Sequence, residues 1–161
     1  MKAVFLDRDG VINKDFGYVG SVDRFEFKEG IFELLKFLQN KGFTLFVVTN
    51  QSGIARGYYR EEDFHKLMQY MIRELKKRGI EIKDYNFCPH HPDITGECEC
   101  RKPKPGMILE LAKKYNINLD NSIIIGDSVS DVEAAKNAGI KKAYLVKDSL
   151  DEVLEKIKGE L

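Results

Sequence analysis

Three aspartates that follow short apolar segments are the residues of this chain best suited to catalysis. Asp7 and Asp9 flank Arg8 at the end of one apolar segment, and Asp127 follows Gly126 after another. Magnesium takes oxygen ligands, so these carboxylates could share one magnesium ion. A carboxylate beside that ion can attack the phosphorus of a phosphate ester, and a second can protonate the leaving oxygen and then activate water. The pattern therefore indicates phosphoryl transfer.

Phosphoryl transfer also needs hydrogen-bond donors for the nonbridging oxygens of the phosphate. Thr49 offers a hydroxyl, Asn50 an amide, and either Lys102 or Lys104 an ammonium group. An isolated Asp-x-Asp pair would read as a turn, because aspartate is common in turns. Its occurrence together with these donors and a Gly-Asp pair further along favours the catalytic interpretation.

A second group of residues has the composition of a metal site. Cys88 and His90 form one pair, Cys98 and Cys100 another, and three thiolates with one imidazole suit a closed tetrahedral zinc site. No cysteine lies outside the range 88–100, whereas a disulfide framework would be spread along the chain. Because such a site has no open coordination position, we expect the zinc to be structural.

The zinc is expected to fold a loop that is too short to hold itself, and so to place Arg101 and Lys102. Two alternatives remain open at this point. His91 could replace its neighbour as the nitrogen ligand, or Cys98 and Cys100 could form a redox pair. A Cys-x-Cys disulfide closes a very small ring, and a reducing compartment disfavours it.

The elements that must position these residues alternate between strand and helix. Apolar runs predict strands at 3–6, 44–48, 85–87, 123–125 and 143–146, and helical periodicity predicts helices from 31 to about 42, over 64–75, 108–115 and 129–138, and from 149 onward. This order predicts an α/β fold with a doubly wound, mainly parallel sheet and helices on both faces. Such sheets bind ligands at the carboxyl ends of their strands, where the polar residues above are found.

Length and composition limit the class of protein. With 161 residues, the chain is expected to form a single domain spanning 1–161. Lys plus Arg and Asp plus Glu are both 26, and this balance argues against nonspecific nucleic-acid binding. No segment approaches a membrane span, and the first apolar run is too short for a signal peptide, so we expect a cytoplasmic protein. We also expect a monomer that acts on a small sugar phosphate.

Four segments resemble the motifs of the haloacid-dehalogenase-like phosphatases. They are Phe5–Val11, Val47–Asn50, Lys102 and Ile125–Asp131. The resemblance runs from Ala3 to about Val146 and implies a Rossmann-like fold. Within that superfamily, 13–18, 49–57, 88–92 and 98–103 closely resemble the D-glycero-D-manno-heptose 1,7-bisphosphate phosphatases. The related histidinol-phosphate phosphatases have a similar layout.

The resemblance implies roles for individual residues. Asp7 would be the nucleophile and Asp9 the acid/base, and Thr49 and Lys102 would steady the transferring phosphoryl group. Magnesium would be bound by the carboxylates of Asp7 and Asp127 and by the main-chain carbonyl of Asp9. The implied zinc ligands are Cys88, His90, Cys98 and Cys100. The implied substrate-binding residues are Asp15, Phe16, Gly17, Tyr18, Asn50, Gln51, Ser52, Arg101 and Ser128.

Two positions in the fourth motif need comment. Asp131 matches a frequent extra acidic residue of the family. We expect its side chain to contact residues that bind the substrate and not the substrate itself. Ser128 departs from the family, where a basic residue is common, so one phosphate or sugar contact is expected to be absent.

Among the remaining charged residues, Arg56, Arg60 and Arg101 could bind a second phosphate, because arginine makes bidentate phosphate contacts. Arg101 has the strongest case, whereas Arg60 stands at a probable helix start and is expected to be a solvated surface charge. His65 is expected to lie on the surface or partly packed.

The motif spacing leaves no room for a cap domain. Only 39 residues separate Asp9 from Thr49, and 52 separate Thr49 from Lys102. We therefore expect an open active site without a cap. The resemblance implies a magnesium-dependent phosphatase that removes the 7-phosphate of the heptose bisphosphate. In that family, the product is used in the synthesis of nucleotide-activated heptose for lipopolysaccharide. The alternatives are histidinol-phosphate phosphatase, a polynucleotide 3′-phosphatase, a phospho-receiver signalling domain, or a zinc-organised binding module.

Overall fold

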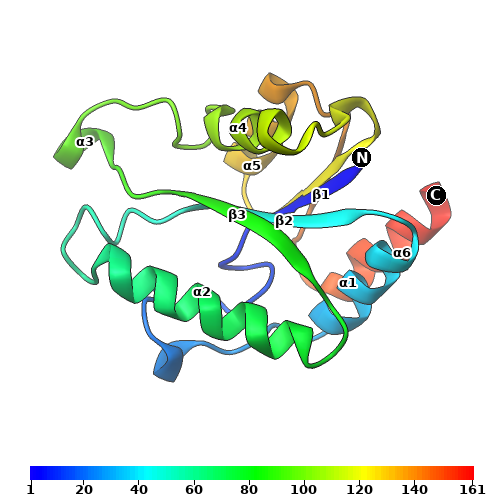
Figure 1. The fold of residues 1–161 in the computed structure, drawn as a ribbon, viewed down its shortest axis with the longest axis horizontal. Helices are drawn as coiled ribbons and strands as arrows, with labels where there is room; N and C mark the ends of the chain where they lie inside the picture. The colour runs from blue at the N-terminus through cyan, green and yellow to red at the C-terminus, as the bar shows by residue number, and fades with distance from the viewer.

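A five-stranded parallel sheet forms the centre of the computed structural model, which describes all 161 residues (Figure 1). Its strands are β1 (Ala3–Leu6), β2 (Thr44–Asn50), β3 (Ile82–Cys88), β4 (Ile123–Gly126) and β5 (Lys142–Leu145). Their spatial order is β3-β2-β1-β4-β5, and every neighbouring pair is parallel. The chain thus winds from β1 to one edge and returns to build the other, which confirms the predicted doubly wound sheet. The switch in direction lies between β1 and β4, where such sheets bind ligands.

Helices cover both faces of the sheet (Figure 1). One face carries α1 (Ile31–Asn40), α2 (Glu61–Lys76) and α6 (Leu150–Glu160), and the other carries α4 (Gly106–Tyr115) and α5 (Val129–Ala138). The short helices are η1 (Val22–Arg24), α3 (Pro92–Thr95) and η2 (Leu119–Asn121). No cap domain is inserted between these elements, as the motif spacing predicts.

Strands β1 and β4 contain no polar side chain, in keeping with burial on both of their faces. In β1, Val4 and Leu6 join the core under α1, α2 and α6, whereas Ala3 and Phe5 join the core under α4 and α5. This alternation follows from the two-residue repeat of a strand. The parallel pairing of β1 with β4 places the ends of these two strands side by side, and the Asp7 amide donates to the Ile125 carbonyl at 3.1 Å.

The edge strand β3 differs most from the sequence prediction. It runs over seven residues, whereas the apolar run predicts only 85–87. Its extra residues include Lys83 and Asp84, and the Asp84 carboxylate accepts from Lys114 and from the Tyr115 hydroxyl. Polar residues on an edge strand pair with a neighbouring helix, so hydropathy does not reveal the strand.

No helix in the structure combines the length and the apolar character needed to cross a membrane.

Candidate active site

The polar residues that follow the strands meet in one cavity. Its volume is about 350 Å³, and its lining includes Asp7, Asp9, Asn50, Lys102 and Asp127. Nearly all of the lining is polar or glycine. Three of the predicted strand-end segments therefore converge at the carboxyl edge of the sheet.

Lys102 is buried at the centre of this cavity. Its Nζ donates to the Val48 carbonyl at 3.0 Å and to Asp131 at 2.5 Å, and lies 3.2 Å from Oδ1 of Asp7. Burial would lower the pKa of Lys102, but Asp7 and Asp131 outweigh it and raise that pKa. The lysine is therefore charged beside the proposed nucleophile. Lys104, the alternative ammonium, instead bonds the carbonyl of Cys98.

Asn50 explains how Lys102 reaches this position. Its side-chain oxygen accepts from the Lys102 amide at 3.0 Å, and its side-chain nitrogen faces the Lys102 carbonyl at 3.3 Å. The end of β2 thus holds the peptide unit of Lys102 on both sides.

Asp131 serves both as a helix cap and as the partner of Lys102. One of its oxygens accepts from the backbone amides of Asp127 and Ser128, each at 3.2 Å, at the start of α5. The other oxygen accepts a hydrogen bond from the Lys102 ammonium group. Gly126 allows this approach, because a Cβ there would lie 2.3 Å from the Asp131 side chain.

The carboxylates of Asp7, Asp127 and Asp131 crowd together, with ligand oxygens within 4.8 Å of one another. Burial raises the pKa of Asp7 well above its ordinary value; nearby Asp131, Asp127 and Asp9 add to this rise, and Lys102 opposes it. Burial also raises the pKa of Asp127, with Asp131 the next cause. A group of hard oxygen donors whose negative charges repel one another fits a magnesium ion.

Gly10 is a glycine for a steric reason. Its φ is +88°, and a Cβ there would lie 1.9 Å from an Asp127 oxygen. The turn after β1 therefore brings the backbone directly against the carboxylate that follows β4.

Asp9 is held by three side chains, none of which the sequence assigned to this task. Arg8 donates to it at 3.0 Å, Asn13 at 2.9 Å and Gln51 at 3.1 Å. Arg8 is fully buried and also donates to the Val19 carbonyl. The signal in the sequence was the repulsion between Asp7 and Asp9, which calls for a cation nearby.

This geometry agrees with comparisons to known proteins. A family model for haloacid dehalogenase-like hydrolases matches residues 2–139. The chain belongs to this family of hydrolases. A Campylobacter jejuni D-glycero-alpha-D-manno-heptose-1,7-bisphosphate 7-phosphatase is 50% identical over 94% of this chain and 86% of its own length.

Two further relatives are informative. The beta-anomer 7-phosphatase of Pasteurella multocida is 48% identical over 91% of this chain and 82% of its own. The crystal structure of D,D-heptose 1.7-bisphosphate phosphatase from B. bronchiseptica, complexed with magnesium and phosphate, is 31% identical. It superposes with a TM-score of 0.84 over the whole of both chains.

The loop before η1 forms one wall of the hydrolase's cavity. Asp15, Gly17 and Tyr18 line it, whereas Phe16 is exposed outside the lining. The Arg24 guanidinium donates to three consecutive carbonyls, those of residues 16, 17 and 18, at 2.8–3.1 Å. This contact, which the sequence did not reveal, fixes a loop in which Tyr18 has a φ of +49°.

Gln51, Ser52 and Ser128 also line the cavity, in keeping with their predicted place. Thr49 is fully buried, and its hydroxyl accepts from the Gln51 amide at 2.9 Å. Arg101 is outside the lining and donates to the His90 carbonyl at 3.3 Å.

Other charged residues of the hydrolase lie away from the reacting groups. Arg56 lies over the Tyr18 ring at 5.7 Å, close to the cavity wall. Arg60 is exposed and pairs with Glu62 and Asp63 at the start of α2, as expected of a surface charge. His65 is partly packed and bonds the Tyr85 hydroxyl at 2.7 Å.

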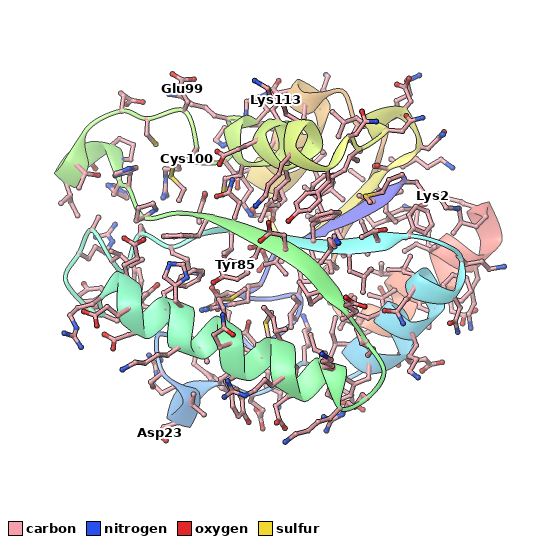
Figure 2. The ribbon with its side chains drawn as sticks, in the orientation of Figure 1. Lys2, Asp23, Tyr85, Glu99, Cys100 and Lys113 are labelled. Carbon is pink, nitrogen blue, oxygen red and sulfur yellow. A yellow bond between two sulfur atoms is a disulfide. The ribbon has the colours of Figure 1, made fainter.

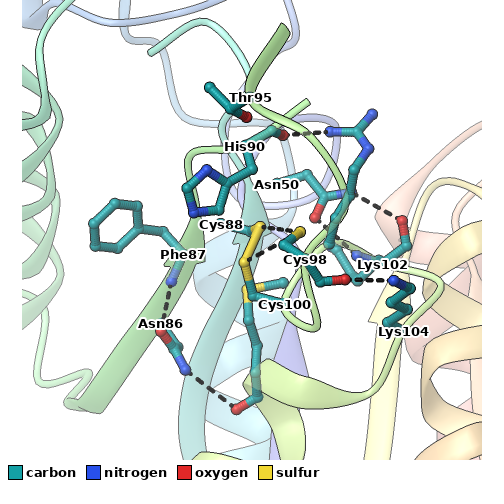
Figure 3. Close-up of a disulfide and its surroundings, with 12 residues drawn as sticks. Asn50, Asn86, Phe87, Cys88, His90, Thr95, Cys98, Cys100, Lys102 and Lys104 are labelled. Atoms are coloured by element: carbon teal, nitrogen blue, oxygen red, sulfur yellow. Dashed lines mark hydrogen bonds between the residues drawn. A yellow bond between two sulfur atoms is a disulfide. The ribbon is translucent and has the colours of Figure 1, made fainter. Parts of the chain in front are cut away.

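The three cysteines come together beside the start of α4, on the opposite side of the sheet from Asp23 and α2 (Figure 2). Their sulfur atoms all lie within 4.8 Å of one another, close enough to bind one metal ion. Figure 3 draws the His90 ring near the cluster in that view, but His90 is not among the residues within that distance, and His91 caps α3 by accepting from the Asp93 amide.

The structure differs in one respect from the predicted state of these cysteines. The structure joins Cys88 to Cys100 in a disulfide and leaves Cys98 free, with its sulfur 3.6 Å from that of Cys88 (Figure 3). The sequence predicted three thiolates and considered only a Cys98–Cys100 bridge. The group within metal-binding distance also comprises the cysteines without His90. Cysteines whose sulfurs can reach one metal ion need only a small shift to form a disulfide, and sequence spacing alone does not select the pair.

Proposed function

We propose that this chain removes the 7-phosphate of D-glycero-D-manno-heptose 1,7-bisphosphate. The observation that carries this proposal is the 50% identity, over 94% of the chain, to a phosphatase of that substrate. The cavity supports it independently, because three crowded carboxylates that could hold a magnesium ion, together with a buried lysine, suit a phosphate ester better than a neutral ligand.

Asp7 is the proposed nucleophile. One carboxylate oxygen attacks the phosphorus, a P–O bond forms to Asp7, and the bond to the sugar oxygen breaks. Asp9 gives its proton to that sugar oxygen. In the second step Asp9 takes a proton from water, the resulting hydroxide attacks phosphorus, and Asp7 and inorganic phosphate are released.

Two residues stabilise the transferring group in this proposal. Lys102 places a full positive charge 3.2 Å from the attacking carboxylate, and Thr49 offers its hydroxyl beside Gln51. Magnesium held by Asp7, Asp127 and the Asp9 carbonyl would neutralise phosphate charge as it transfers.

Substrate recognition is assigned to the walls of the open cavity. Asp15 and the backbone around Gly17 and Tyr18 face the sugar from one side, and Ser52 and Ser128 face it from others. Phe16 and Arg101 lie at the margin, where Arg101 would meet the second phosphate after a change of rotamer.

We also propose that, in the reduced protein, the cysteine cluster holds a structural zinc ion with His90 as the fourth ligand. Three sulfurs already share one site, and a move of the His90 ring toward them would complete a tetrahedral ligand set. Metal-bound thiolates persist in a reducing compartment, so we place this hydrolase in the cytoplasm. We also propose that it is a monomer and that its 161 residues form one domain.

The test is phosphate release with magnesium from matched concentrations of both anomers of the heptose bisphosphate, histidinol phosphate and simple sugar phosphates. We expect kcat/KM at least about a hundredfold higher for one or both heptose anomers, because recognition of a second phosphate adds transition-state binding. Preference for histidinol phosphate would reject the substrate and keep the chemistry. A stable phosphoprotein without turnover would reject the phosphatase.

A further inference from the structure

Tyr59 occupies a slot that two glycines leave open for it. A Cβ at Gly20 would lie 2.4 Å from its ring, and a Cβ at Gly53 would lie 2.3 Å from it. The ring is therefore held from two sides by backbone that no other residue type would allow to approach. Such a fit fixes where the Tyr59 hydroxyl points, and it points at the side-chain oxygen of Gln51.

The direction of the Gln51 amide follows from its other partners. Its nitrogen donates to Oδ2 of Asp9 at 3.1 Å and to the Thr49 hydroxyl at 2.9 Å. With its nitrogen on these two oxygen acceptors, the amide turns its oxygen end toward Tyr59. The hydroxyl is the donor that this oxygen requires.

Tyr59 is suited to remain a donor. Burial raises the pKa of its hydroxyl to about 12, with Asp9 adding to the rise and Arg8 opposing it. Without that hydroxyl, the oxygen of the almost fully buried Gln51 would lose its partner. A buried amide oxygen without a partner costs free energy, and the amide would then be held against Asp9 by its nitrogen alone.

We infer that Tyr59 is a positioning residue for the acid/base step: its hydroxyl holds the Gln51 amide so that the amide nitrogen fixes one carboxylate oxygen of Asp9. The other oxygen is held by Arg8 and Asn13, which belong to the same turn as Asp9, and Arg8 also donates to the first oxygen at 3.3 Å. Tyr59 and Gln51 connect Asp9 instead to the segment after β2. The inference rests on the proposed function, in which Asp9 protonates the leaving oxygen.

The experiment compares Tyr59→Phe with Tyr58→Phe. Both changes remove one hydroxyl and keep the ring, but Tyr58 is 61% exposed and has no part in this network. Each variant is assayed on the heptose bisphosphate and on 4-nitrophenyl phosphate. A sugar alkoxide must be protonated as it leaves, whereas 4-nitrophenolate leaves as a stable anion, and kcat/KM reports the steps up to that departure.

For Tyr59→Phe we expect kcat/KM to fall about tenfold on the sugar ester and less than about twofold on the aryl ester, as partial loss of general acid catalysis requires. Tyr58→Phe should match the wild type on both. An unchanged ratio in Tyr59→Phe, equal losses on both esters, or the same shift in Tyr58→Phe would each overturn the inference.

A readout without turnover separates this inference from the proposed function. The Gln51 side-chain NH₂ should exchange slowly with solvent by NMR in the wild type and at least about tenfold faster in Tyr59→Phe, because local opening then costs one hydrogen bond less. Unchanged exchange would overturn the positioning role. Failure of the wild type to hydrolyse the heptose bisphosphate, with this exchange difference present, would reject only the proposed substrate.

Discussion

Asp7 stands out among single residues because its ionised form is disfavoured by burial and by three neighbouring carboxylates, while Lys102 supports it. We predict that Asp7→Asn abolishes phosphate release without unfolding the protein, since the amide cannot attack phosphorus and removes a repelled charge. Phosphate release and thermal denaturation measure the two effects. Asp120→Asn, at an exposed surface position, is the matched control and should change neither. Retained turnover in Asp7→Asn would show that another group is the nucleophile.

The same residue predicts how stability depends on pH. Its folded pKa lies above the ordinary value of 3.8, so the folded state retains a proton that the unfolded state releases. The protonated Asp7 therefore contributes its full stabilisation of the folded state below pH 3.8, and this contribution is lost as pH rises through the pKa of Asp7 in the folded state. We expect the chelated protein to lose several degrees of melting temperature across that window. Magnesium should reverse the loss, and Asp7→Asn should flatten it; a flat wild-type profile would contradict this reasoning.

At the scale of elements, the site depends on how closely the turn after β1 approaches the loop after β4. Gly10→Ala puts a methyl group 1.9 Å from an Asp127 oxygen and also forces alanine into a φ of +88°. We expect a loss of about 1–2 kcal/mol from the backbone alone, and in addition weaker magnesium binding and at least tenfold slower turnover.

Gly139→Ala is the control for that variant. Its φ of +96° carries the same backbone cost, but nothing lies within 4 Å of the added carbon. It should lose stability and keep both magnesium affinity and rate. If the two variants lose activity equally, the contact between Gly10 and Asp127 is not what matters.

At the scale of the whole molecule, the cysteine cluster joins the end of β3 to the segment that carries Lys102 and leads into α4. A disulfide between Cys88 and Cys100 and a shared zinc ion would both make this connection. Only the zinc requires Cys98. We therefore predict that Cys98→Ser lowers the melting temperature and the zinc content of the reduced protein but not the stability of the oxidised protein, whereas Cys100→Ser destabilises both.

Melting curves and metal analysis under reducing and oxidising conditions would measure these effects. Reduced wild-type protein that carries no zinc would reject the zinc proposal and leave the disulfide as the connection. Equal effects of the two substitutions in both states would show that the cluster does not hold this part of the molecule together.

The sequence by itself determined the sheet, its doubly wound order, the absence of a cap and the candidate carboxylates. Buried parallel strands are continuous apolar runs, and residues that follow such strands meet at one edge of the sheet whatever the details of packing. Asp7, Asp9 and Asp127 were predictable for that reason, whereas Asp131 was implied only by the family resemblance. Edge strand β3 was predicted only in part, because its polar residues pair with α4.

Only the tertiary structure decided which side chains from distant segments meet. It showed how Lys102, which the family resemblance had implied and the residue pattern alone had left open against Lys104, comes to lie beside Asp7 through the contact of Asn50 with its backbone. It paired Cys88 with Cys100, and it brought Tyr59 into the slot behind Gln51. Such choices depend on distances of a few ångströms between elements, and residue type and spacing do not encode those distances individually.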